Sequence, residues 1–451
     1  MKTKNMTVGK PGAMIFTFAL PLIAGNLFQE FYTVADTIIV GQFLGVDALA
    51  AVGSGGWVTW MLLSAVQGLV QGFSIPAAQG FGAGDKAAIR KNMGNAAVLS
   101  LILSIILMII GEIALPSLLS LLDTKAEIFD DALLYLRIYY AGCPIMVVFN
   151  YAACYLRAFG NSSAPLRAMI IAAVTNIVLD ILFVGPLGFG IAGAVIATLI
   201  AQVVASVYAL IYLFKIDFVS FSKDDLRVDW DYYKKILLIG APMSLQNIII
   251  SVGGLIVQYI VNQYSLTYVA GFTATNRLYG LIETAGISYG YALTTYVGQN
   301  KGAGEYKRIK SGVLSGLFIG IATSLIIAVV MILFGKIILG MFVSGTKEEI
   351  TATIQVAYRY LFIMSSFLPI LYGLHIYKAS LVGLGNSAIP MFSGVAELIM
   401  RVGASFIMPY YFGEMNLFFA EPIAWLGALV VLFTGYIWCM NRLERKKNIL
   451  T

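Results

Sequence analysis

The sequence predicts an all-α membrane protein with twelve transmembrane helices, and three observations lead to this fold class. Hydrophobic residues form 59% of the 451 residues, charged residues only 12%, and the mean hydropathy is +0.86. A soluble domain of that composition would expose large apolar patches. Polar and Gly/Pro-rich breaks divide the chain into twelve apolar segments, each long enough for the roughly 20 residues that cross the hydrocarbon layer. The third observation is an internal repeat.

The twelve segments form two groups of six, separated by a charged stretch. Their approximate bounds are 13–43, 48–79, 92–118, 129–157, 164–186 and 189–214, followed by 236–263, 268–299, 309–342, 350–382, 386–411 and 416–440. Several exceed the minimum length, so we expect tilted helices or helices that extend beyond the membrane. The first segment continues past Pro21 without a small-residue cleavage site, so we expect no cleavable signal peptide.

The repeat relates the two groups of segments. The run QGFGAGDKAAIRK, from Gln79, matches QNKGAGEYKRIKS, from Gln299, at an offset of 220 residues. FGNSSAP, from Phe159, matches LGNSAIP, from Leu384, at 225. In the same way Pro21 matches Pro242 at 221, and Pro144 matches Pro369 at 225. The glycines of the GAGD and GAGE loops predict tight turns between helices.

A near-constant offset indicates two homologous six-helix lobes. Six is an even number of crossings, so both lobes share one orientation and are related by a pseudo-twofold axis along the membrane normal. We therefore divide the chain into an N-terminal lobe (1–214), a linker (215–235) and a C-terminal lobe (236–451) with a short cytoplasmic tail. The mixed charges of the linker predict a solvated cytoplasmic loop without a specific site.

The basic residues predict the orientation. If the N-terminus is cytoplasmic, 22 of the 29 Lys and Arg residues fall in cytoplasmic connections or termini, among them Lys86, Arg167 and Lys215, whereas Lys125 falls on the opposite side. Both termini are then cytoplasmic, and we expect a multi-pass protein of the cytoplasmic membrane. The net charge of +6 follows from this topology, so we do not expect nucleic acid as a partner.

Four polar residues stand in apolar segments of the first half. Asp36 lies in EFYTVADTIIVGQ, Asn176 and Asp180 lie in TNIVLDILF, and Thr198 lies in the next segment. The spacing of four residues puts Asn176 and Asp180 on one helix face. Their oxygens could bind Na⁺, or the carboxylates could exchange H⁺, because burial and a nearby like charge favour the protonated acid. The choice between the two ions stays open.

The alternative to an ion site is simple hydrogen bonding across helices. Such a contact stabilises a membrane protein by about 0.6 kcal/mol on average. A carboxylate at the middle of the bilayer costs about 2.5 to 3.5 kcal/mol on insertion scales. The functional interpretation is therefore favoured for Asp36 and Asp180, and it is weaker for Asn176 and Thr198, since amides and hydroxyls often join helices.

The second half does not copy this pattern. The equivalents of Asp36, Asn176 and Asp180 are Val257, Arg401 and Ser405. Other polar residues mark possible second-lobe sites, namely Glu283, His375, Glu397 and Arg401. Glu397 and Arg401 are four residues apart and could neutralise each other. His375 is interpreted as a hydrogen-bonded interior residue, and Glu283 has no partner nearby in the sequence.

A cavity for large apolar cations or amphiphiles would be lined by aromatic residues, Met and a few polar groups. The candidates by helix position are Phe28, Tyr32, Tyr139, Tyr140, Phe149, Met243, Gln246 and Tyr259. Cys143, Cys154 and Cys439 lie in apolar runs and suggest neither disulfides nor a metal site. No nucleotide-binding loop or catalytic motif is found, so we predict no catalytic residues.

Taken together, these features resemble the multidrug and toxic compound extrusion (MATE) family. The resemblance rests on the duplicated halves, Leu20–Pro21, the ADTIIVGQ run, the paired GAGD and GAGE loops and the NIVLD run, and it covers nearly the whole chain. It is stronger to the bacterial DinF-like and MepA-like branch than to the NorM-like branch. NorM-like members have a Glu on helix seven, and residues 243–264 contain no acid.

The resemblance implies the twelve-helix MATE/MOP fold and a secondary active transporter that exports cationic or amphipathic drugs in exchange for H⁺ or Na⁺. It implies no enzyme activity and no cofactor. The family's ion site falls on Asp36, Asn176, Asp180 and Thr198, and its helix-one bend falls on Pro21. The resemblance implies no metal ion other than a Na⁺ that could bind at Asp36 and Asp180. Expected partners are small-molecule substrates and membrane lipid, and we expect a monomer.

Two other functions are alternatives to drug export. A flippase for lipids or lipid-linked precursors, from the same superfamily, would usually show more helices or a markedly basic central cavity. A polytopic enzyme or receptor is disfavoured by the duplicated halves and by the lack of a catalytic constellation.

Overall fold

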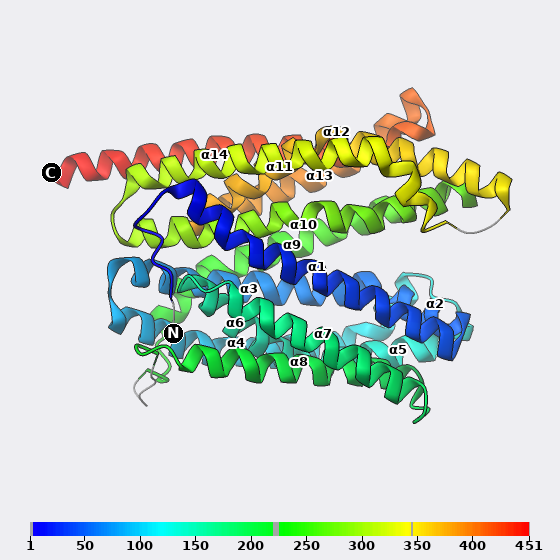
Figure 1. Cartoon of the computed structure of the whole chain (residues 1–451), viewed down its shortest axis with the longest axis horizontal. Coiled ribbons are helices and arrows are strands. Elements are labelled where there is room, and N and C mark those ends of the chain that lie inside the picture. The colour runs from blue at the N-terminus through cyan, green and yellow to red at the C-terminus, as the bar shows by residue number, and fades with distance from the viewer. Residues whose placement is uncertain (1–2, 220–224, 344–345, 451) are drawn as a thin grey trace. The chain divides into compact units, whose positions relative to one another are not determined.

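The computed structural model describes residues 3–219, 225–343 and 346–450, and this part of the chain is almost entirely helical, with no strand (Figure 1). The first half contains α1 (Pro11–Leu44), α2 (Val46–Ser54), α3 (Gly56–Ala83), α4 (Lys86–Leu121), α5 (Ala126–Ala141), α6 (Cys143–Ala158), α7 (Ser163–Val184) and α8 (Gly190–Phe214). The second half contains α9 (Trp230–Val261), α10 (Leu266–Gly302), α11 (Tyr306–Gly340), α12 (Lys347–Gly383), α13 (Ala388–Phe412), the 3-10 helix η1 (Glu414–Phe419) and α14 (Ala420–Leu450).

Each of the twelve predicted segments lies on helix. In the described residues, ten spans are long and apolar enough to cross a membrane, and the pair α5 and α6, bent by 47°, makes an eleventh. The one predicted segment that remains is 268–299. It lies on α10, which is less apolar because it is rich in Thr, Gly and Tyr. These side chains bond to neighbouring helices: the Thr275 hydroxyl donates to the Ala357 carbonyl of α12 at 2.8 Å. A helix surrounded by other helices needs no apolar outer face.

Equivalent glycines of the repeat adopt equivalent conformations. Gly84, in the GAGD loop, and Gly304, in the GAGE loop, both have φ of 73°. Gly160 and Gly385, in the second matched pair of runs, have φ of 80° and 74°. Positive φ is strained for residues with a side chain, so glycine is required at these helix junctions. The predicted tight turns are therefore confirmed.

The chain packs into two compact units. The first comprises Leu20–Asn247 together with the N-terminal residues up to Met6, and the second comprises Thr7–Ala19 together with the chain from Ile248 onward. The unit boundary divides α1 next to Pro21 and divides α9 after Asn247. The predicted lobes follow the repeat, whereas these units follow the packing. The two divisions of the chain therefore assign parts of α1 and α9 differently.

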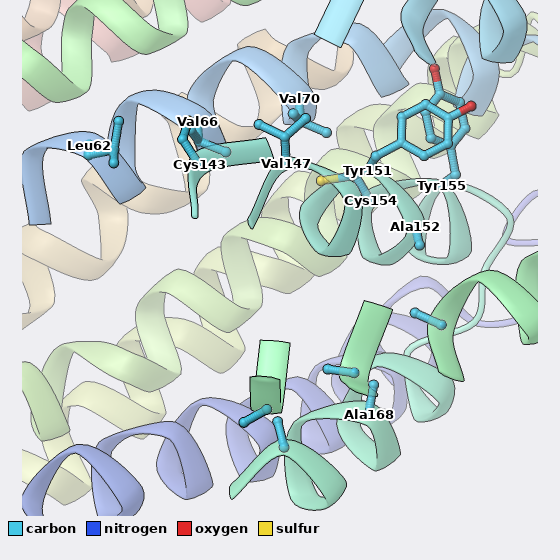
Figure 2. Packing of buried hydrophobic residues seen from close by; sticks show 14 of the residues in the cluster. Leu62, Val66, Val70, Cys143, Val147, Tyr151, Ala152, Cys154, Tyr155 and Ala168 are labelled. Carbon is cyan, nitrogen blue, oxygen red and sulfur yellow. The ribbon is translucent and has the colours of Figure 1, made fainter. Parts of the chain in front are cut away.

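The core of the first unit draws buried residues from α1 to α9, and α3 and α6 supply the largest shares. Figure 2 shows Leu62, Val66 and Val70 of α3 near Val147 and Tyr151 of α6. The Tyr151 hydroxyl within this core donates to the Met93 carbonyl at 2.7 Å. Burial of such side chains supplies packing contacts. In a membrane these contacts hold the helices together, because the lipid chains are as apolar as the side chains and no hydrophobic driving force remains.

The described residues of the predicted linker are mostly exposed, as expected of a solvated loop, but both of its ends contact the first unit. Phe218 packs against Phe159 with ring centroids 5.1 Å apart, and Val219 is buried. At the other end of the linker, Asp229 forms an ion pair with Lys91 of α4 at 2.7 Å. The helix α9 begins at Trp230, so 230–235 are helical, whereas 220–224 lie outside the described residues. Apolar residues among the charges explain the docking.

Candidate functional site

Two helices of the first unit bring Asp36 and Asp180 together. Gly25 of α1 lies against Met169 of α7, and Phe43 near the end of α1 lies against Gly185 just after α7. The two helices therefore run side by side in the same direction, and this register brings Asp36 level with Asp180. The two carboxyl groups interact directly with each other.

Asn176 and Thr198 complete the same cluster, as the sequence predicts. Asp180 is 0% exposed and Asn176 is 1% exposed, one helical turn apart on α7. The Asn176 amide nitrogen donates to the Thr198 hydroxyl oxygen on α8 at 3.2 Å. That hydroxyl donates in turn to the Ala194 carbonyl at 3.2 Å. These bonds fix the amide so that its oxygen remains available as an acceptor.

The cluster has more acceptors than donors. No donor from the described residues reaches Oδ1 of Asp36, either carboxyl oxygen of Asp180, or Oδ1 of Asn176. Gln202 Oε1, one turn beyond Thr198 on α8, is a further buried acceptor without a donor. Two facing carboxylates attract each other only if one carries a proton or if a cation lies between them. The arrangement can therefore bind a proton or a small cation.

A cavity opens beside this cluster in the first unit. It is small and partly open to its surroundings. Thr198 of the cluster lines the cavity. Tyr32 and Gln202, which adjoin the cluster, line the cavity as well. Aromatic and amide side chains supply much of the rest of its lining, namely Gln29, Gln67, Tyr139, Phe149 and Asn150. A lining of aromatic side chains with a few polar groups is typical of small-molecule sites.

The predicted substrate residues fall into three groups. Tyr32, Tyr139 and Phe149 line this cavity, and the others do not. Tyr140, Met243 and Gln246 are buried at 3%, 3% and 0% exposure, with the Tyr140 hydroxyl donating to the Val58 carbonyl. Phe28 and Tyr259 are exposed. The amides Gln29, Gln67, Asn150 and Gln202 were not predicted, although their recurrence in apolar segments is a usable signal.

The second unit pairs its buried acids with bases. Glu283 of α10, which has no partner nearby in the sequence, meets His375 of α12, with Oε1 and Nε2 3.0 Å apart. Glu283 therefore has a partner that only the packing of α10 against α12 provides.

Arg401 lies at the centre of a buried triad. Its Nη2 donates to Glu397 Oε1 at 2.6 Å, the pair that the i,i+4 spacing suggests, and to Glu421 Oε2 of α14 at 2.8 Å. Arg401 Nη1 donates to the Ile250 carbonyl at 3.4 Å. The sequence analysis missed Glu421, because it stands near the start of an apolar segment, where an acid suggests the membrane surface.

The two units thus treat buried acids in opposite ways. Glu283, Glu397 and Glu421 each have a basic partner, whereas Asp36 and Asp180 have only each other, Asn176 and uncharged neighbours. In the described part of the chain, no three His, Cys, Asp or Glu side chains gather as a metal-binding group. A Na⁺ ion at Asp36 and Asp180 would therefore need amide and hydroxyl oxygens as additional ligands.

Comparisons with known proteins identify relatives of this chain. The MatE family model matches residues 21–182 and 242–407, and the two ranges start at Pro21 and Pro242, a matched pair of the repeat. The probable multidrug resistance protein YpnP of Bacillus subtilis (strain 168) is 32% identical over 344 residues, which are 76% of this chain and 77% of the relative. The probable multidrug resistance protein YoeA of the same strain is 25% identical over 441 residues, 95% of this chain and 94% of the relative.

A solved structure covers the whole chain. It is a crystal structure of MATE in the bent conformation, which is 27% identical and aligns with a TM-score of 0.88 over 100% of both chains.

Proposed function

Because the chain belongs to the MatE family of membrane transporters, we propose that it exports cationic or amphipathic small molecules in exchange for inward-moving H⁺ or Na⁺. The names of its relatives YpnP and YoeA, probable multidrug resistance proteins, support the class of substrate. The export would occur by alternating access, with the binding region open to one side of the membrane at a time.

One observation carries the ion-coupled part of this proposal. Asp36 and Asp180 interact in a buried site, and no basic partner or donor among the described residues reaches their unpaired oxygens. A proton or Na⁺ at this site would remove the repulsion between α1 and α7. Two like charges about 4 Å apart repel by about 4 kcal/mol at an effective dielectric constant near 20. That energy is enough to shift a two-state equilibrium by about a thousandfold.

Pro21 is the proposed point at which α1 responds. Proline has no backbone N–H, so the helical hydrogen bond to the carbonyl four residues earlier is missing and the helix bends more easily there. The unit boundary falls beside this residue. One relative has been crystallised in a bent conformation. We propose that ion binding at Asp36 changes the balance between the straight and bent forms of α1.

The first prediction tests this site. Asp36→Asn and Asp180→Asn each remove an ionisable group, so both should abolish gradient-driven drug transport and leave membrane insertion intact. The measurement is ethidium uptake into energised inverted vesicles, with pH and Na⁺ gradients imposed separately. The matched control is Glu112→Gln, which changes a partly exposed acid near Arg137 in the same unit and should transport normally.

The outcomes separate the alternatives. Transport that persists in both aspartate variants would refute the ion site. A response of the wild-type protein to one gradient alone would identify the ion. If the wild-type protein responds to neither gradient, the lipid flippase becomes the better hypothesis.

A further inference from the structure

Two cations lie beside one tyrosine, near the start of α7 and the end of α8. The Arg167 guanidinium lies 5.5 Å from the centroid of the Tyr212 ring, and the Lys215 ammonium lies 5.6 Å from the same centroid. Arg167 Nη1 also donates to the Tyr212 hydroxyl at 3.4 Å, and Tyr208 stacks on Tyr212 with centroids 4.6 Å apart. Two exposed positive charges thus lie beside the same aromatic ring.

No acid among the described residues forms an ion pair with either of these two bases. Two other exposed bases do have acidic partners: Lys91 pairs with Asp229, and Lys310 pairs with Glu444 at 2.5 Å. Two like charges held around one ring repel each other, so an anion that contacts both would be bound favourably.

Exposed apolar stripes lead away from the basic pair along both helices. On α7, Val174 and Val178 follow Arg167 at seven and eleven residues, which places them on the same helix face, and each is 59% exposed. On α8, Val207, Ile211 and Phe214 precede Lys215 and are exposed by about half. In a membrane-spanning protein such stripes face the lipid chains, so the basic pair is at the level of the headgroups.

We propose that Arg167, Lys215 and Tyr212 form a binding site for the headgroup of an anionic phospholipid. The phosphate would lie between the two cations, and the acyl chains would follow the apolar stripes of α7 and α8. A lipid, rather than a free phosphate, is the occupant because the stripes continue directly from the charges. Both cations belong to the set that the basic-residue count places on the cytoplasmic side, where anionic lipid attracts basic residues.

The test compares lipid binding to the full-length protein in detergent. Native mass spectrometry measures the binding of added phosphatidylglycerol and of zwitterionic phosphatidylcholine. Arg167→Gln with Lys215→Gln should weaken phosphatidylglycerol binding by about 30-fold, or about fivefold for each cation, as expected from about 1 kcal/mol per basic residue. Phosphatidylcholine binding should not change.

Two control variants isolate the site. Lys336→Gln removes a single cation that lies 4.9 Å from the Tyr358 ring on α12, and it should leave phosphatidylglycerol binding unchanged. Arg167→Lys preserves the charge and should keep most of the binding. Unchanged binding in the double variant, or an equal loss in Lys336→Gln, would overturn the proposal. So would equally tight binding of glycerol 3-phosphate, which has no acyl chains. None of these readouts depends on transport.

Discussion

Individual buried charges show most clearly how the two units differ. Asp180 and Glu397 are both carboxylates on helices with apolar surroundings, at 0% and 5% exposure. Glu397 is held in place by Arg401 at 2.6 Å. Asp180 faces another carboxyl group, Asp36, and its two oxygens have no donor among the described residues. Residue type alone does not distinguish a structural acid from an exchangeable one; the partner does.

A stability prediction follows from the Arg401 triad. Arg401→Met would leave Glu397 and Glu421 buried without their base. Removal of one partner from a buried ion pair destabilises a protein by about 3 to 5 kcal/mol. The thermal unfolding midpoint in detergent should therefore fall strongly. As the control, Arg137→Met removes an exposed cation 3.8 Å from Glu112, and it should change stability by about 1 kcal/mol or less. Similar shifts for the two variants would contradict this interpretation.

At the scale of elements, the linker sets the start of α9. The Asp229 carboxylate accepts a bond from the Tyr232 backbone N–H at 3.0 Å, which caps the new helix. The Asp229 backbone N–H donates to Asn95 Oδ1 of α4 at 3.3 Å. Gly94 of α4 permits the close approach of Asp225 of the linker, since a Cβ at Gly94 would lie 2.1 Å from the Asp225 carbonyl oxygen. The linker is thus a structural part of the first unit.

Removal of the Asp229 charge should loosen the linker. Asp229→Asn loses the ion pair with Lys91 and weakens the helix cap, so hydrogen exchange of the amides of 225–229 should become several-fold faster. Asp231→Asn, two residues later, changes an exposed acid in the first turn of α9 and should have little effect. Equal exchange in the two variants would show that the docking does not depend on Asp229.

The same contact should be sensitive to acid. The hydrogen bond from Lys91 holds the pKa of Asp229 below its usual value. A lowered pKa means that the docked linker favours the charged form. Its stabilisation is therefore complete above the free-aspartate value of about 3.9 and is lost as the pH falls through the lowered value. Exchange of 225–229, corrected for the intrinsic effect of pH, should accelerate only at that acidic limit. Acceleration near neutral pH would point to another group.

At the scale of the whole chain, a repeated backbone carries two different sets of polar residues. The matched glycines Gly84 and Gly304 have the same φ of 73°, so the helix junctions are preserved between halves. The position of Asn176 in the first half corresponds to Arg401 in the second. One half thus provides unpaired acceptors, and the other provides a neutralised network. We propose that ion coupling belongs to the first half alone.

The orientation of the chain can be tested directly. The basic-residue count places Lys86 on the cytoplasmic side and Lys125 on the opposite side. Both side chains are exposed, and the three native cysteines are buried. A membrane-impermeant maleimide added to intact cells should label Lys125→Cys and not Lys86→Cys. Both variants should react after the cells are opened, which controls for reactivity. The reverse labelling pattern would show that the topology is inverted.

The sequence by itself determined the helical fold, the repeat and its helix junctions, and the cluster of Asp36, Asn176, Asp180 and Thr198 as candidates. These follow from local properties, because hydropathy, helical spacing and glycine conformation act within a few residues of the chain. The tertiary structure decided which acids are paired. His375 reaches Glu283 across 92 positions, and Glu421 reaches Arg401 from another helix. It also revealed the amide-lined cavity and the docked linker, since the facing direction of a side chain depends on which helices pack around it.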